Sequence, residues 1–241
     1  MARWETIQVD GQPMRMYLDF PAGGGTLPAV IVIQHGPGVD RFIEDRVEKL
    51  ARPGYLAAAP DLYHRQPPDG DMMTRIGRLR DKEVIAEVNT TINHIQRLPD
   101  ARVGSIGIIG FCMGGRVTYL MAGSNPIFKA AGVFYGGNIM VQWGDGPSPF
   151  DLTRHISCPM AGFFGVDDTN PSPADVKKIG EELDRFKKPH EFHSYAGAGH
   201  AFLNFLNPNT YREQPAAAAW EQLLGFLEKT LKAKVAAPAL T

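Results

Sequence analysis

The sequence is poor in cysteine: its 241 residues contain only two, Cys112 and Cys158. Two cysteines cannot form the disulfide framework of a small secreted domain. No apolar run reaches the roughly 20 residues that a membrane-spanning helix needs. The first residues, Met1 to Glu5, lack the apolar segment of a secretory signal. We therefore expect a cytoplasmic protein, in a reducing compartment where a nucleophilic thiol survives.

An excess of charge of one sign is also lacking. The 25 lysines and arginines are balanced by 26 aspartates and glutamates, which leaves a formal net charge of −1. A protein that binds nucleic acid or a membrane through its overall field carries a clear positive excess. We therefore expect a small-molecule partner, no nucleic-acid or membrane partner, and a monomer or small homo-oligomer.

The common motifs for phosphate, dinucleotide and metal binding are missing as well. The chain has no G-x-x-x-x-G-K-[ST], H-E-x-x-H or C-x-x-C sequence, and Gly104, Gly107 and Gly110 are spaced wrongly for a dinucleotide fingerprint. His190 and His193 fall on a predicted strand, where residues three apart point to opposite faces. The sequence therefore predicts neither a metal site nor a cofactor.

What the sequence does contain is an alternation of continuous apolar runs with amphipathic stretches. Such runs are typical of buried parallel strands, and the stretches between them show helical spacing. The predicted strands are Trp4–Val9, Met14–Phe20, Ala29–Ile33, Tyr55–Ala59, Val103–Ile109, Ala130–Tyr135, Met160–Phe164 and Glu191–Tyr195. The predicted helices are Asp40–Ala51, Lys82–Leu98, Arg116–Ala122, Pro173–Phe186 and Glu213–Leu231. The first two strands are expected to form an antiparallel hairpin at a sheet edge.

This order of elements favours the α/β class. We predict a mostly parallel, doubly wound sheet flanked by helices on both faces. With 44% hydrophobic residues and no shift in composition, residues 1–232 are expected to form one domain. Residues 233–241 are expected to be a disordered tail. The polar stretch His64–Gly77 is predicted to be a loop or a lid over a site.

A glycine-rich segment, Gly110-Phe111-Cys112-Met113-Gly114-Gly115, separates a predicted strand from a predicted helix. Strand, sharp turn and helix with a nucleophile at the turn is the pattern of the nucleophile elbow, G-x-S-x-G in hydrolases. Side chains two positions either side of the nucleophile would collide with strand and helix, which explains the glycines. Taken alone, the segment is equally compatible with a buried, inert cysteine.

Other reactive side chains also follow predicted strands. In a parallel sheet the carboxyl ends of the strands form the site. The order Cys112, then Asp167 or Asp168, then His200 is the nucleophile, acid and histidine order of α/β hydrolases. An imidazole can take the thiol's proton, and a carboxylate fixes the imidazole tautomer. This order favours a reactive Cys112 over an inert one, and a functional His200 over a surface loop histidine.

A tetrahedral intermediate also needs an oxyanion hole. The backbone N–H of Met113, directly after the nucleophile, is the first predicted donor. The second is expected in the loop after Ala29–Ile33, where Gly36 is the candidate, unless it is a plain turn glycine. Cys158 precedes Pro159 at the start of a strand and is predicted to be structural.

These segments together resemble the dienelactone hydrolase (carboxymethylenebutenolidase) family of the α/β-hydrolase superfamily. The resemblance runs from Ala29–Ile33 to the closing helix, and it covers nearly the whole chain. The segments that carry it are the cysteine elbow, Pro60-Asp61-Leu62-Tyr63 followed by Arg65-Gln66, Gly165-Val166-Asp167-Asp168, and Gly197-Ala198-Gly199-His200-Ala201-Phe202. The resemblance selects Asp168 as the acid. It implies an α/β-hydrolase fold, no cofactor, and a Cys-His-Asp triad that hydrolyses an enol lactone or related ester through an acyl thioester.

Two positions depart from the family's pattern. Members carry a glutamate after the first central strand, where this chain has His35, and members that act on dienelactone carry an arginine four residues past the catalytic histidine, where it has Asn204. A neutral histidine is no anionic partner for the thiol, and asparagine carries no charge. Arg75, Arg78 or Arg80 either supplies a cation instead or is simply solvated. We therefore expect an ester or lactone that is less anionic than dienelactone.

Substrate selectivity is expected to depend on the segments Tyr63–Gly77 and Gly136–Pro149. The candidate substrate contacts are His35, Tyr63, Arg78, Tyr135, Phe202 and Asn204. Two alternatives to an ester or lactone hydrolase remain at this stage. One is a catalytically weak ligand-binding protein on the same fold, and the other is a redox-sensing thiol, which lacks an obvious resolving cysteine.

Overall fold

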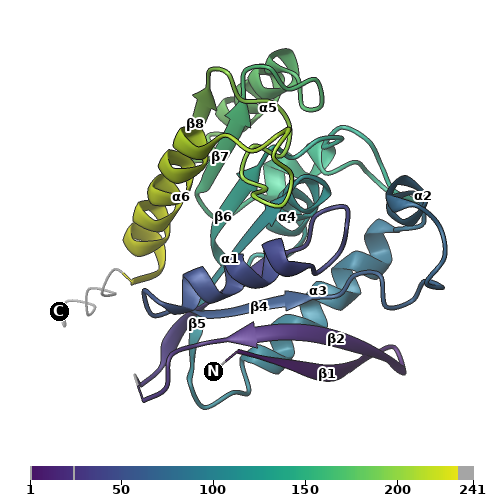
Figure 1. Cartoon of the computed structure of the whole chain (residues 1–241), viewed down its shortest axis with the longest axis vertical. Coiled ribbons are helices and arrows are strands. Elements are labelled where there is room, and N and C mark those ends of the chain that lie inside the picture. The colour runs from purple at the N-terminus through teal and green to yellow at the C-terminus, as the bar shows by residue number, and fades with distance from the viewer. Residues whose placement is uncertain (1, 24, 233–241) are drawn as a thin grey trace.

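Strands from both halves of the chain join in one mixed sheet in this computed structural model, which describes residues 2–23 and 25–232. Among those residues the strand order is β1-β2-β4-β3-β5-β6-β7-β8 (Figure 1). The strands are β1 Arg3–Val9, β2 Gln12–Asp19, β3 Leu27–Ile33, β4 Leu56–Pro60, β5 Ala101–Phe111, β6 Phe128–Phe134, β7 Met160–Gly165 and β8 His190–Tyr195. The predicted tail, 233–241, lies outside the described residues.

The predicted edge hairpin and parallel centre are both confirmed. Strand β1 pairs antiparallel with β2, and β2 pairs antiparallel with β4. From β4 through β3 to β8 every pairing is parallel. The carboxyl ends of β3, β5, β6, β7 and β8 therefore meet along one edge of the sheet.

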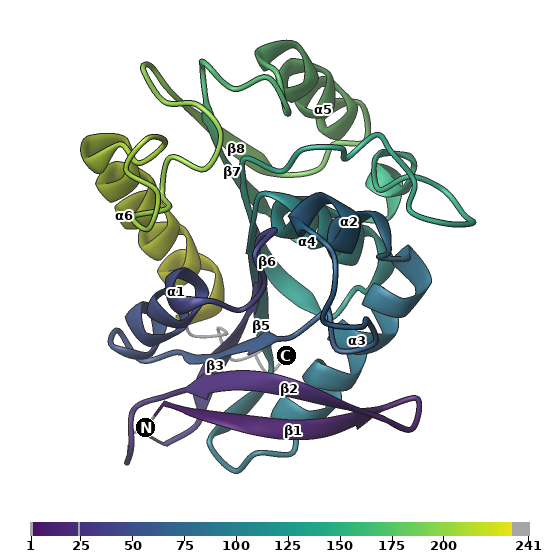
Figure 2. The same cartoon turned by 45° about the vertical axis from the view of Figure 1, so that its right-hand side comes forward.

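Helices cover both faces of the sheet, as the sequence predicts. Figure 2 shows α1 and α6 on one side and α3, α4 and α5 on the other. The helices are α1 Arg41–Ala51, α2 Met72–Gly77, α3 Asp81–Ile95, α4 Met113–Ser124, α5 Pro173–Arg185 and α6 Glu213–Leu227, with a 3₁₀ helix at Phe150–His155 and a π-helical turn at Glu228–Lys232. This is the α/β-hydrolase arrangement of a mostly parallel sheet between two helical layers.

Strand β3 shows why the sheet is buried on both faces. All of its residues are buried, and successive side chains point to opposite sides. Ala29, Ile31 and Ile33 belong to the core under α3, α4 and α5. Val30 and Val32 belong to the core under α1 and α6. A continuous apolar run is what such a two-sided position requires.

Two elements differ from the sequence-based expectation. Helix α2 lies inside His64–Gly77, which was predicted as a loop or a lid; it has only 6 residues, none of them buried, and is too short for a helical pattern to show. Asp71 caps it, accepting a hydrogen bond from Thr74 N at 2.7 Å. Helix α4 begins at Met113, before the predicted Arg116, because contacts override the low helix propensity of its two glycines.

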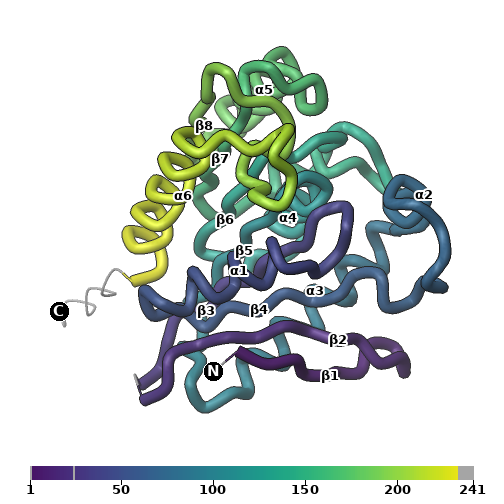
Figure 3. Tube along the Cα trace, in the orientation of Figure 1, coloured from purple at the N-terminus to yellow at the C-terminus, as the bar shows by residue number. Residues whose placement is uncertain are grey.

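Within residues 2–23 and 25–232, no helix is both long and apolar enough to cross a membrane. The loop from β8 to α6, yellow-green in Figure 3, folds back toward α1. There the ring of Phe205 lies 5.9 Å from the ring of Phe42, between centroids. This loop carries His200 to the carboxyl edge of the sheet.

Candidate active site

The elbow is a strained turn. Strand β5 ends at Phe111, helix α4 begins at Met113, and Cys112 between them has φ 57° and ψ −122°. A side chain rarely adopts positive φ, and such strain persists only where the surroundings enforce it. Here it lifts the Cys112 thiol to the partly exposed tip of the turn.

The elbow glycines are required by close backbone contacts. A Cβ on Gly110 would lie 2.1 Å from the carbonyl oxygen of Gly114. A Cβ on Gly114 would lie 2.3 Å from the carbonyl oxygen of Gln34, at the end of β3. A Cβ on Gly115 would lie 2.7 Å from the Cα of Gly136. The steric reason expected from the motif is therefore present at all three positions.

The structure brings His200 and Asp168 together and leaves Asp167 in solvent. His200 Nδ1 lies 2.9 Å from Asp168 Oδ2. The side chain of Asp168 is 1% exposed, and its Oδ1 accepts a hydrogen bond from Asn170 N at 2.9 Å. A carboxylate can only accept, so Nδ1–H donates and the other ring nitrogen is left free toward the thiol.

His200 is held as a strong proton acceptor. Burial lowers its pKa, but hydrogen bonding to Asp168 and to Cys112, together with the charges of both, outweighs burial and raises the pKa to about 10. By contrast, burial raises the pKa of the Cys158 thiol to about 11, in keeping with its predicted structural role. Cys158 is buried, whereas Cys112 is partly exposed.

Two backbone amides are placed to form the predicted oxyanion hole. Met113 N follows Cys112 at the start of α4, and Gly36 lies in the loop after β3, which packs against that helix start through Gly114. Among the described residues, neither amide donates a hydrogen bond to another protein group. Unpaired N–H groups at this point are available to an oxygen of a bound substrate.

A cavity of about 250 Å³ opens over Cys112, His200 and Asp168. Its remaining walls come from α2, the start of α4, and the loops after β6 and β7. They are Met72, Met73, Ile76, Met113, Gly137, Asn138, Trp143, Thr169 and Asn170. The two segments expected to set selectivity both contribute to it.

None of the six predicted substrate contacts lines this cavity. His35 Nε2 is 2.9 Å from Asp40 Oδ1, and the Tyr63 hydroxyl donates to the Gly36 carbonyl at 2.8 Å. Burial alone would raise the pKa of Asp40; its contacts with His35 and with two α1 amides outweigh burial and lower it. The His35 and Tyr63 side chains are buried and do not line the cavity.

Tyr135 and Phe202 lie behind the ring of His200. The Tyr135 ring lies 5.2 Å from the His200 ring and 5.4 Å from the Phe202 ring, edge to face, between centroids. Both side chains are buried, and neither lines the cavity. Asn204 also lies outside the lining, where its Oδ1 accepts from Leu206 N at 3.1 Å. These groups support the histidine loop rather than face the cavity.

The three arginines considered as replacement cations are engaged elsewhere. The Arg75 guanidinium stacks 4.0 Å from the Tyr63 ring centroid. Arg78 pairs with Asp69 at 2.8 Å, and Arg80 donates to the carbonyls of Gly77 and Leu79. None of them lines the cavity.

Sequence reasoning named the two segments that supply the apolar wall of the cavity but none of the residues in it. Met72, Met73 and Ile76 come from the unpredicted helix α2, and Trp143 comes from a loop. The methionines in a suspected lid were a signal for α2, whereas Trp143 had none beyond its place in the second segment. Across the described ranges, no group of three or more potential metal ligands was found.

An α/β hydrolase is defined by this strand order, by the elbow after β5, and by an acid and a histidine that follow later strands. The sequence profile of the dienelactone hydrolase family matches residues 14–231. The chain belongs to this family and is a dienelactone hydrolase-like hydrolase.

Similar proteins agree over nearly the whole length. A "Putative carboxymethylenebutenolidase" of Synechocystis sp. is 36% identical over 240 residues, covering 95% of this chain and 94% of that protein. A "Probable 2-oxo-3-(5-oxofuran-2-ylidene)propanoate lactonase" of Bradyrhizobium sp. is 31% identical over 235 residues, covering 93% and 92%. The crystal structure of a "Putative Dienelactone Hydrolase" from Klebsiella pneumoniae superposes with a TM-score of 0.88 at 30% identity, covering 95% and 98%.

Proposed function

We propose that the chain hydrolyses small esters or lactones through a triad of Cys112, His200 and Asp168. The observation that carries the proposal is the 2.9 Å Asp168–His200 pair in one cavity with a cysteine on a strained elbow. A nucleophile, a base and a group that orients the base are the parts that acyl transfer needs. The names of the relatives, which describe hydrolysis of lactones, support this class of substrate.

The first half of the proposed reaction forms an acyl thioester. His200 takes the proton from the Cys112 thiol, and the thiolate attacks the carbonyl carbon of the ester. The N–H groups of Met113 and Gly36 donate to the oxyanion of the tetrahedral intermediate. When the intermediate collapses, the C–O bond breaks and the leaving oxygen takes the proton from His200. A lactone keeps this oxygen tethered as an alcohol.

The second half releases the acid, and the electrostatics of His200 assist it. Cys112 contributes to the raised pKa of His200 in the free enzyme. Once the sulfur is acylated it bears no negative charge, so this contribution ends and the pKa of His200 falls. The neutral imidazole then takes a proton from water, which attacks the thioester. The products are a carboxylic acid and the regenerated Cys112 thiol.

The substrate that fits this cavity is small and uncharged near the reacting carbonyl. Side chains of Met72, Met73, Ile76 and Trp143 offer apolar surface. A carboxylate placed against them would lose hydration without gaining a partner. Methionine side chains also adapt their shape, which suits substrates with varied apolar groups.

Hydrolysis of p-nitrophenyl butyrate and of an uncharged enol lactone tests the proposal. We expect Cys112→Ala to lower kcat/KM by about 10⁴-fold or more, because the nucleophile is lost. The matched control is Cys158→Ala, which removes the buried thiol and should retain turnover. Unchanged turnover in Cys112→Ala would refute the mechanism. Saturable ester binding without turnover, and without an acyl adduct by intact mass, would instead indicate a ligand-binding protein.

A further inference from the structure

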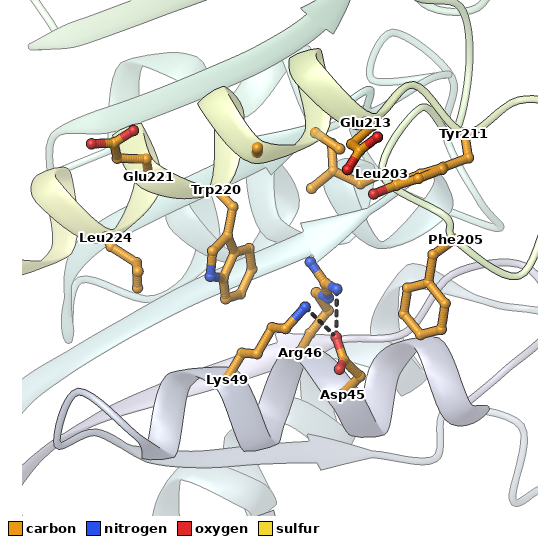
Figure 4. Close-up of a pocket in the computed structure, with 12 residues that line it drawn as sticks. Asp45, Arg46, Lys49, Leu203, Phe205, Tyr211, Glu213, Trp220, Glu221 and Leu224 are labelled. Atoms are coloured by element: carbon orange, nitrogen blue, oxygen red, sulfur yellow. Dashed lines mark hydrogen bonds and ion pairs between the residues drawn. The ribbon is translucent and has the colours of Figure 1, made fainter.

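A second cavity, of about 590 Å³, lies between α1 and α6. The loop after β8 closes one end of it with Leu203, Phe205 and Tyr211, and Figure 4 shows these side chains facing Arg46 and Trp220. It shares no lining residue with the cavity over Cys112. A volume of this size accommodates a small organic molecule.

A buried guanidinium projects into this space. The Arg46 side chain is 6% exposed, and in Figure 4 it rises from α1 between Trp220 and Phe205. Its NH2 nitrogen pairs with Asp45, whereas its enclosed Nε has no hydrogen-bond partner among the described residues. Burial lowers the pKa of Arg46 more than Asp45 raises it. A buried donor without an acceptor costs free energy, so we expect a ligand to supply an acceptor for the Nε–H of Arg46.

The charges at the floor of the cavity favour an anion. Lys49 Nζ lies 3.2 Å from Asp45 Oδ2, so two cations share a single carboxylate. Glu213 and Glu221 line the α6 side, but both are exposed and therefore screened by water. On the α1 floor of the cavity, Arg46 and the 37%-exposed Lys49 therefore outnumber the single carboxylate of Asp45.

The walls around the guanidinium are aromatic and apolar. Arg46 Cζ lies 4.8 Å from the centroid of the Trp220 ring and 5.7 Å from that of Phe205. Phe205 is 38% exposed and the adjacent Leu206 is 47% exposed. Exposed large apolar side chains beside a cavity are typical of a binding site.

We propose that this cavity binds a small carboxylate with an aromatic or alkyl body. The carboxylate oxygens would accept hydrogen bonds from the Arg46 guanidinium, and the body would lie against Trp220, Phe205 and Leu224. An inorganic anion would leave these walls uncovered, and a neutral apolar molecule would leave Arg46 without an acceptor. Ester hydrolysis releases acids of this class, but the binding proposal stands without that activity.

Calorimetric titration with 4-phenylbutyrate, and with the neutral 4-phenylbutyramide as matched ligand, tests the proposal. We expect the wild-type protein to bind the acid at least about tenfold more tightly than the amide, because only the acid offers a charged acceptor. Arg46→Gln should abolish this preference. Since that variant alters a buried group, Ala217→Phe serves as the second variant: position 217 is exposed, lines the cavity, and its phenyl ring would fill the space.

Two control variants locate the binding. Cys112→Ala should leave the affinity for 4-phenylbutyrate unchanged, and Glu221→Gln should leave it unchanged or slightly raise it. Loss of binding in Cys112→Ala with retention in Ala217→Phe would place the acid at the active site and overturn the proposal. Equal affinity for acid and amide, or no heat from either at about 10 mM, would overturn it as well.

Discussion

At the scale of single residues, Cys112 and His200 are coupled through one proton. Asp168 and Cys112 together raise the pKa of His200 to about 10, against the lowering effect of burial. The contribution of Asp168 to this pKa persists throughout the proposed reaction, because Asp168 remains in place. The contribution of Cys112 ends when the thiol is acylated. In the proposed reaction this coupling favours a protonated His200 before attack and a neutral His200, able to act as a base, afterwards.

Replacing Cys112 by serine should lower the pKa of His200. A serine hydroxyl stays neutral, so the contribution of Cys112 disappears while the Asp168 hydrogen bond remains. We expect the ring titration, followed by NMR of labelled histidine, to move below its midpoint of about 10. Cys158→Ser is the control and should leave that midpoint in place. Identical midpoints in Cys112→Ser and wild type would contradict the coupling.

The stability that His200 gains from Asp168 should depend on pH with a definite sign. The folded-state pKa of His200, about 10, lies above the unfolded value of 6.5, so this contribution is full below about pH 6.5 and is lost as pH rises through about 10. Urea unfolding at pH 6, 8 and 10 should therefore show wild type losing its advantage over Asp168→Asn as pH rises. An advantage that grows with pH would contradict this sign.

Some site residues could be predicted from sequence and others could not. Cys112 and His200 both lie in glycine-rich segments after predicted strands, an apolar one for Cys112 and a mostly polar one for His200, and their order in the chain adds information. Choosing Asp168 over Asp167 required the family resemblance, and the structure has Asp168 buried and Asp167 exposed. His35 and Tyr63 follow strands too, yet their partners, Asp40 and the Gly36 carbonyl, are set by tertiary contacts that no local pattern reveals.

At the scale of elements, the start of α4 is positioned by its contact with the end of β3. The Cα of Gly114 faces the carbonyls of Ile33 and Gln34 so closely that a Cβ would lie 2.3 Å from the Gln34 oxygen. This contact places the β3 loop, and with it Gly36, beside the elbow. The geometry of the proposed oxyanion hole thus depends on the absence of one methyl group.

Gly114→Ala should therefore destabilise the protein and reduce its activity. Because both partners are backbone, the clash can be relieved only by moving α4 or β3, and we expect a loss of about 2 kcal/mol or more in the free energy of unfolding. Gly225→Ala in α6 is the matched control, since nothing lies within 4 Å of its added Cβ. It should be neutral or stabilise by up to about 1 kcal/mol. Equal urea midpoints for the two variants would rule out the steric argument.

Helix α2 shows which kind of element sequence patterns fail to predict. The central strands were found because apolar runs mark two-sided burial, and α1 and α5 because each has one apolar face. Helix α2 buries none of its residues and instead turns Met72, Met73 and Ile76 to the cavity. These residues are three and four positions apart, as on one face of a helix, but a helix of 6 residues inside a polar stretch is too short for that spacing to be recognised.

The residues of α2 should determine which substrate charge the enzyme prefers. Met73 is 66% exposed and lines the cavity, so Met73→Arg should fold normally and introduce a cation there. We expect wild type to prefer p-nitrophenyl pentanoate over mono-p-nitrophenyl succinate, and Met73→Arg to shift the kcat/KM ratio toward the succinate by about tenfold or more. Val103→Arg, at an exposed position outside the cavity, is the control. An equal shift in both variants would show that overall charge, rather than α2, sets the preference.

At the scale of the whole molecule, one buried ion pair ties three distant segments together. Arg116 in α4 is fully buried, and its guanidinium donates to both carboxylate oxygens of Asp81 at the start of α3, at 2.6 and 2.9 Å. It also donates to the carbonyls of Asn138 and Val141 and stacks on the Trp143 ring at 3.8 Å. Since Asn138 and Trp143 line the cavity, the pair joins two helices to a wall of the site.

Removing one member of this pair should be far more costly than removing a surface pair. Asp81→Asn leaves the Arg116 cation buried without its counter-charge, and we expect a loss of about 3–5 kcal/mol in the free energy of unfolding, measured by urea titration. The exposed pair Arg78–Asp69 is the matched control, and Asp69→Asn should cost about 1 kcal/mol or less.

Adding Arg116→Met to Asp81→Asn should recover part of the stability, because it removes the orphaned charge. The loop that holds Asn138 and Trp143 would still lack its anchor, so kcat/KM for p-nitrophenyl butyrate should stay low in the double variant. Recovery of both stability and kcat/KM would mean that the pair has no part in shaping the site.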